Sequence, residues 1–175
     1  MDPLTRLQDD IAAVLSECSG LAGVPIYLLS KTSDQAVAAI VDQINQATAG
    51  LVPNADGKSG LALCVVLPGY RVTDPDAPGP QGLCEIIVQC IENTTVNGGE
   101  NGFTIGAFAA GQEVVAQLHH HAVSSWGVIY ADERGVTPMG LDDNWSADLA
   151  YEAVLTMPIS GRPKSKASPP LIVAD

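Results

Sequence analysis

The sequence predicts a single domain of the α+β class, in which about three helices pack on a four- to five-stranded sheet that is mixed but mainly antiparallel. Three observations support this prediction. The chain has 175 residues, 46% of them hydrophobic, which is enough for one domain with its own core. Apolar residues recur at helical spacing in some segments and alternate in others. The 17 glycines and 12 prolines indicate many turns and exclude a simple helical bundle.

Three segments have the apolar spacing of amphipathic helices. We expect the first helix to begin at Pro3, behind an N-cap at Asp2, and to end before Gly20. The second fits residues 34–48, and the third continues to about residue 121. The apolar positions that define the first and third helices are Leu4, Leu7, Ile11, Val14, Leu15 and Cys18, and Phe108, Gly111, Val115 and Leu118.

Two short apolar runs predict strands at residues 26–29 and 61–67. The second run is continuously apolar, which is typical of a central strand covered on both faces. Residues 68–82 follow, and their prolines and glycines argue against a helix or an interior strand. We expect either a mobile surface hairpin loop or an arm that contacts a partner.

Alternation is clearest in two longer strands, at residues 83–92 and 147–159, and the second is long enough to cross a whole sheet. Between them, Trp126–Tyr130 and the segment around Val136 suggest a short hairpin that turns at residues 132–135.

The strand at residues 83–92 has one apolar face and one mixed face. A mixed face predicts partial cover, either by a helix of the same chain or by a neighbouring subunit. The apolar face holds Cys84, Ile86, Val88 and Cys90. The candidate oligomer interface combines the mixed face, Glu85, Ile87, Gln89 and Ile91, with Tyr70 and Arg71 of the preceding segment.

The composition changes at Gly161, so we divide the chain into a domain at residues 1–160 and an extended tail at residues 161–175. The tail is rich in proline and holds three of the eight basic residues. Its Leu171–Val173 run could add a strand to the sheet edge of another chain, or it could be a frayed terminus.

A net charge of −12 repels phosphate backbones, so tight nucleic-acid binding is not expected. The same charge could line a passage through which a polyanion slides without adhering. The start of the chain has no secretory leader and no run is long enough for a membrane helix, so we expect folding in the cytosol and no membrane partner. The four cysteines lack CxxC spacing, which favours free buried thiols.

Each candidate for chemistry has a simpler explanation. Gly57–Ser59 resembles the end of a phosphate-binding loop, but the first glycine of that motif is missing.

The consecutive His119–His121 point in different directions on a helix, so interaction with the helix dipole explains them better than metal binding does. Asp142 and Asp143 fit a solvated acidic turn better than a cation site. There is no nucleophile elbow. The sequence therefore predicts no catalytic, cofactor or metal site and no enzyme.

With its elements in this order, the chain resembles phage tail terminator proteins, which are also grouped among tail completion and minor tail proteins. The resemblance spans roughly residues 3–160 and follows patterns rather than a signature. The segments that carry it are the first amphipathic helix, Gly23–Leu28, the hairpin pattern of residues 63–69 and 82–88, the helix of residues 109–118 and the closing strand Leu149–Leu155.

The resemblance implies a small mixed sheet with packed helices and a homohexameric ring around the channel that DNA traverses. It also implies partners, namely the tail tube protein and the head–tail connector, and a place in the virion neck after assembly in the host cytoplasm. DNA would be only a passing polyanion. Two alternatives stay open: another head-to-tail completion protein, or a small cytosolic metal- or ligand-binding protein that uses His119–His121 and Asp142–Asp143.

Overall fold

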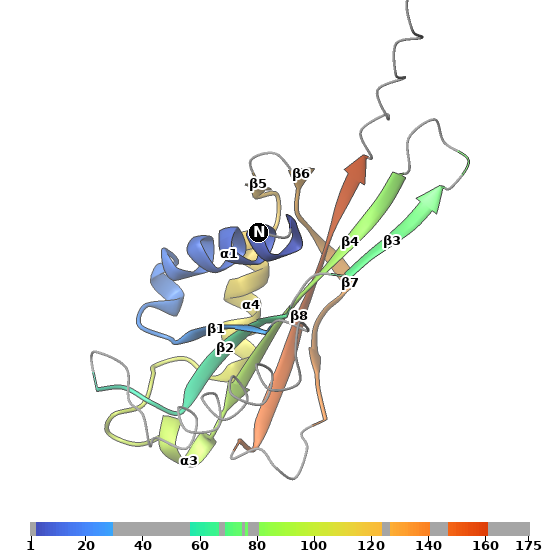
Figure 1. Cartoon of the computed structure of the whole chain (residues 1–175). Helices are drawn as coiled ribbons and strands as arrows, with labels where there is room; N and C mark the ends of the chain where they lie inside the picture. The colour runs from blue at the N-terminus through green and yellow to red at the C-terminus, as the bar shows by residue number, and fades with distance from the viewer. Residues whose placement is uncertain are drawn as a thin grey trace, which may run out of the picture.

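The computed structural model describes residues 3–29, 57–66, 69–74, 76, 81–123, 127–140 and 147–160. These ranges form a mixed six-stranded sheet with helices packed on it, so the predicted α+β class is confirmed and the sheet is slightly larger than expected (Figure 1). The elements are α1 (Pro3–Ser16), η1 (Ser19–Leu21), β1 (Ile26–Leu29), β2 (Leu61–Val66), β3 (Gly69–Asp74), β4 (Gln81–Glu92), α3 (Thr94–Asn97), α4 (Ala107–Leu118), β5 (Ala122–Val123), β6 (Gly127–Val128), β7 (Tyr130–Pro138) and β8 (Leu149–Ser160).

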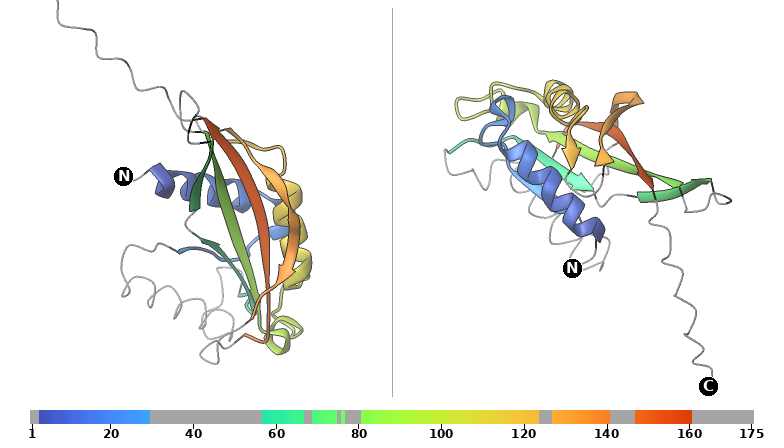
Figure 2. Two further views of the ribbon diagram at one scale, coloured as in Figure 1. Left: turned by 90° about the vertical axis from the view of Figure 1, so that its right-hand side faces the viewer. Right: turned by 90° about the horizontal axis from the view of Figure 1, so that it is seen from above.

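Strand β4 lies at the centre of the sheet, whose order is β1-β2-β4-β8-β7. β8 pairs with β4 along its whole length, from Gln81↔Ser160 to Glu92↔Leu149, and Figure 2 shows the two strands side by side. β2 and β3 follow one another along the opposite side of β4. Only the β1–β2 pair is parallel among the described pairs, which confirms a mixed and mainly antiparallel sheet.

The main core lies between one face of the sheet and the two longer helices, α1 and α4. As predicted, the first helix buries every third or fourth residue, and the alternating residues of β4 point into the same core. Gln8 fixes α1 to the sheet, because its side-chain amide donates to the carbonyl oxygens of Leu29 and Val65. The fully buried core side chains of α1, α4 and β4 are Leu7, Ile11, Leu15, Ala107, Ala110, Val114, Leu118, Cys84, Ile86, Val88 and Cys90.

The third predicted helix is present as α4, but its buried stripe differs from the prediction. Phe108 is 46% exposed and packs edge-on against Tyr151, while the smaller Ala107 and Ala110 face the sheet. Gly111 brings α4 close to β7, because a β-carbon at this position would lie 2.7 Å from a methyl group of Val136. Small residues therefore face the sheet where the large Phe108 was expected.

Residues 68–82 were expected to contain no helix and no interior strand. The structure places the strand β3 at Gly69–Asp74, where it pairs only with β4 among the described strands, and the prolines of the segment fall outside this span. One strand prediction is wrong. The expected turn at residues 132–135 is instead a bulge within β7, where the pairing with β8 shifts register between Ala131 and Val136. The hairpin that precedes it joins β5 and β6.

A buried polar network closes the end of the sheet where β4 leads into α3. Asn93 caps α3, because its side-chain oxygen accepts a hydrogen bond from the backbone N–H of Val96. Asn97 donates to the Glu92 carboxylate and to the carbonyl oxygen of Ile105, and it accepts from the backbone of Phe103. Its polar atoms are thus satisfied without water. The predicted helix at residues 34–48, Asp142–Asp143 and the tail lie outside the described residues.

Candidate interaction site on the sheet edge

The most exposed part of the sheet is the end that holds β3. We call this the β3 arm and define it as Gly69–Asp74 of β3 with the paired residues 81–85 of β4 and 156–160 of β8. In Figure 1 the arm extends beyond the two long helices. Within the described residues β3 pairs only with β4, so its other edge has no strand partner there.

Two large side chains of β3 stay exposed on the arm: Tyr70 at 44% and Val72 at 48%. The Tyr70 ring lies across Gly82 of β4, where a β-carbon would be 2.1 Å from the nearest ring atom. An aromatic ring placed over a glycine of a neighbouring strand shields the exposed backbone there. The arm thus presents an aromatic side chain that packs on the neighbouring strand of its own hairpin.

A charged cluster lies on the other face of the arm. Arg134 of the β7 bulge donates from its guanidinium to Glu85 at 2.5 Å and to Asp132 at 2.7 Å. The hydrogen bond from the Arg134 side chain holds the pKa of the Asp132 carboxyl below its usual value. Arg134, which is shared by both ion pairs, has a side chain that is 48% exposed, so each pair contributes at most about 1 kcal/mol.

A shallow cavity of about 190 Å³ opens on the arm and is lined by Gly69, Tyr70, Arg71, Leu83 and Glu85. Three of the six residues predicted for the oligomer interface, Tyr70, Arg71 and Glu85, therefore meet at one place. Arg134 is not among the six predicted interface residues, since its position before Gly135 in an acidic segment is typical of a turn.

The other three predicted interface residues lie farther along β4, away from the cavity. Ile91 is fully buried in a second cluster with Ala62, Cys64 and Ala150, so it offers no surface to a partner. The half-buried Gln89 donates to Glu152 on β8 at 3.1 Å. Ile87 is half-buried opposite Val154. The exposed part of the expected interface is therefore concentrated on the arm.

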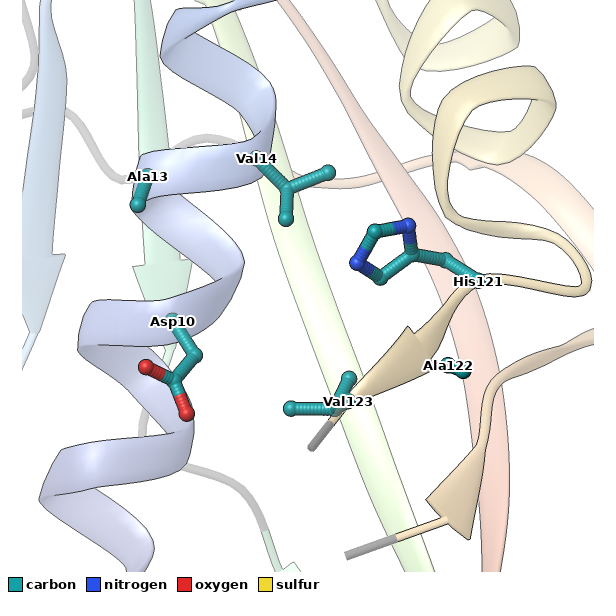
Figure 3. A pocket seen from close by; sticks show the side chains of 6 residues that line it. All are labelled: Asp10, Ala13, Val14, His121, Ala122 and Val123. Carbon is teal, nitrogen blue, oxygen red and sulfur yellow. The ribbon is translucent and has the colours of Figure 1, made fainter. Parts of the chain in front are cut away.

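A second cavity, of about 260 Å³, lies between α1 and β5 (Figure 3). The Asp10 carboxylate and the His121 imidazole point toward it from opposite sides, and small apolar side chains line the rest. A single carboxylate and a single imidazole give too few ligands for a structural metal site, which normally takes four.

The three histidines follow α4, which ends at Leu118 instead of continuing to residue 121. His119 stacks on His120, and its Nδ1 accepts a hydrogen bond from the backbone N–H of Ala131 at 2.9 Å. This bond places the ring proton of neutral His119 on Nε2, which leaves neither nitrogen ready to bind a metal. The ring therefore ties the end of α4 to β7.

The four cysteines are core residues rather than reactive groups. Burial raises the pKa of Cys64 and of Cys90 to about 12, and burial together with Glu85 raises that of Cys84 to about 11. The high pKa values make Cys64, Cys84 and Cys90 poor nucleophiles. All four cysteines of the chain are buried and free, as predicted. Among the described residues, no three His, Cys, Asp or Glu side chains form a group that could hold a metal ion.

No described helix is long and apolar enough to cross a membrane. Comparison of the chain with protein-family models, with curated proteins and with solved structures finds no match.

Proposed function

We propose that this chain is a structural subunit of the tail-terminator type, which assembles into a ring that caps a phage tail tube and joins it to the head connector. The observation that carries the proposal is the β3 arm. It combines an edge strand, two exposed apolar side chains and Glu85, which pairs with Arg134 of β7, at the end of the sheet that the described helices leave uncovered. An edge of this kind is a template for contact with another chain.

A ring requires heterologous contacts, in which one surface of a copy meets a different surface of the next. The arm supplies one such surface, and the rest of the body is free to supply the other. The charge of −12 fits a passage for DNA, because an acidic lumen does not hold the polyanion. In this role the chain has no catalytic residue, and its work is done by repeated protein contacts.

The proposal is tested by negative-stain electron microscopy of the purified chain over a range of protein and salt concentrations. We expect closed rings with a central opening, more abundant at higher salt because salt screens the repulsion between acidic copies. Class averages that show only single subunits, at every salt and up to millimolar protein, would contradict it. Open filaments would also contradict it, because they lack the closed symmetry that a tail end needs.

A further inference from the structure

The described edges of the sheet differ in how well they are protected against strand addition. β1 is only four residues long, and a very short edge strand offers few backbone groups to an added strand. β7 carries the charged bulge of residues 132–135 and ends at Pro138. Bulges, charges and prolines are the usual means of blocking an edge. β3 also carries charged residues and a register shift, between Val72 and Asp74, but it has no proline. Its residues before the shift pair regularly with β4 and include the exposed Tyr70 and Val72.

The chain itself carries a segment suited to this edge. β8 ends at Ser160, which pairs with Gln81, and Gln81 in turn pairs with Asp74 at the end of β3. The tail at residues 161–175 therefore starts at the tip of the arm. Ten residues with three basic side chains and three prolines lead to Leu171–Val173, a run of apolar residues of which two are β-branched. An extended linker of this length spans about 30 Å, whereas the three strand spacings from β8 to a strand outside β3 are only about 15 Å.

We propose that Leu171–Val173 of one copy adds as a strand to the outer edge of β3 in a neighbouring copy. Main-chain hydrogen bonds provide the affinity in strand addition, and side-chain pockets provide the specificity. Here alternate side chains of the added segment lie beside Tyr70 and Val72 on one face, and beside the cavity of Arg71 and Leu83 on the other.

Charge favours exchange between copies over docking within one copy. The tail holds three of the eight basic residues but only one of the 20 acidic residues. Residues 1–160, which must approach the same residues of the next copy in a ring, are therefore more acidic than the whole chain. A basic tail that reaches across to the next copy offsets this repulsion where two bodies approach. The inference rests on the proposed ring, in which every copy has a neighbour, and a tail-to-edge contact is heterologous as a ring requires.

Hydrogen–deuterium exchange of the full-length chain at low and high protein concentration tests the inference. We expect exchange of β3 amides to slow by tenfold or more as concentration rises, while β8 amides stay unchanged. In Ile172→Asp, β3 exchange should stay fast at all concentrations, and a synthetic peptide with the sequence of residues 161–175 should restore the protection. Protection of β3 that is independent of concentration, or absent, or unaffected by Ile172→Asp would overturn the inference.

The masses of the same samples, measured by light scattering, separate this inference from the proposed function. Rings that form equally well in Ile172→Asp, without β3 protection, would overturn tail exchange and leave the ring proposal standing. Tail-dependent protection in samples that contain only dimers or open chains would support tail exchange and overturn the closed ring.

Discussion

The carboxylate of Glu92, at the end of β4, accepts a hydrogen bond from the backbone N–H of Ala107 at 2.6 Å and thereby fixes the start of α4. Glu92 is only 7% exposed, and its second carboxylate oxygen accepts from Asn97. Both oxygens therefore face N–H donors in a site closed to solvent. The position at which α4 begins depends on this one side chain.

Glu92→Gln replaces one acceptor oxygen with a donor. The NH₂ group of the new amide then faces another donor, either the side-chain amide of Asn97 or the backbone N–H of Ala107. Because buried donors are left without an acceptor, we expect the free energy of unfolding to fall by about 1–3 kcal/mol. Urea denaturation at neutral pH measures it. Glu152→Gln is the matched control, because the half-buried Glu152 meets a single side-chain donor, and its effect should stay below about 0.5 kcal/mol. Equal effects of the two changes would contradict the role of Glu92.

Gly82→Ala tests the packing of Tyr70 on the arm. The added methyl group would occupy the space of the Tyr70 ring, so either the ring is displaced or the two strands separate. We expect a loss of about 1–3 kcal/mol in the free energy of unfolding, together with a change in tyrosine fluorescence. Gly69→Ala on β3 is the control, since nothing lies within 4 Å of its added methyl group. A neutral Gly82→Ala would show that the ring does not rest on Gly82.

His119 offers a test of the link between α4 and β7. His119→Ala removes the acceptor of the Ala131 N–H, so the exchange of this amide should accelerate by about fivefold, as expected for one hydrogen bond of about 1 kcal/mol. His119→Asn keeps an acceptor at a similar distance from the backbone and should preserve protection. Hydrogen exchange followed by NMR at neutral pH measures both. Loss of protection in both variants, or in neither, would contradict the assigned bond.

The buried thiols make the native chain resistant to alkylation. With a pKa of about 12, only about one in 10⁴ of the Cys64 and Cys90 thiols is ionised at pH 8, so iodoacetamide should modify them only after unfolding. Mass spectrometry with and without urea measures the difference. Rapid modification of either thiol in the native chain would contradict their burial.

The same thiols predict how stability depends on alkaline pH. Their pKa values are raised in the folded state above the ordinary value of 9.0, so the folded chain holds these protons longer than the unfolded chain. Their contribution is complete below pH 9 and should decline as the pH rises toward 12. Urea midpoints measured at several alkaline pH values test the slope, and a midpoint that rises over this window would contradict the sign.

The elements that the sequence predicts correctly are those in which a local repeat of apolar residues matches the residues that are buried. Alternation identifies β4 and β8, because both strands run through a sheet with one fully apolar face. Helical spacing identifies α1 for the same reason. By contrast, the stripe of α4 depends on how closely the helix approaches β7, which the sequence does not encode locally. Phe108 was therefore assigned to the wrong face.

The candidate site was only partly predictable. Tyr70, Arg71 and Glu85 could be proposed from the mixed face and the segment before it, and they do lie together. Ile91 fits the same alternation, yet tertiary packing buries it. Arg134 reaches Glu85 across β8 from a bulge, and no local signal distinguishes a bulge in a long strand from the turn of a hairpin. The edge position of β3 became clear only from the pairing of the strands.

Light-scattering mass over a concentration series, for the unaltered chain and for two exposed-residue variants, tests most directly the claim that this protein works by assembly through its β3 arm. Val72→Asp places a charge on the arm, whereas Leu149→Asp places one on the opposite end of the sheet, at a side chain that is 42% exposed. We predict a ring-sized mass for the unaltered chain and for Leu149→Asp, and a strongly reduced mass for Val72→Asp. A monomeric mass for the unaltered chain at every concentration, or full assembly of Val72→Asp, would contradict the claim.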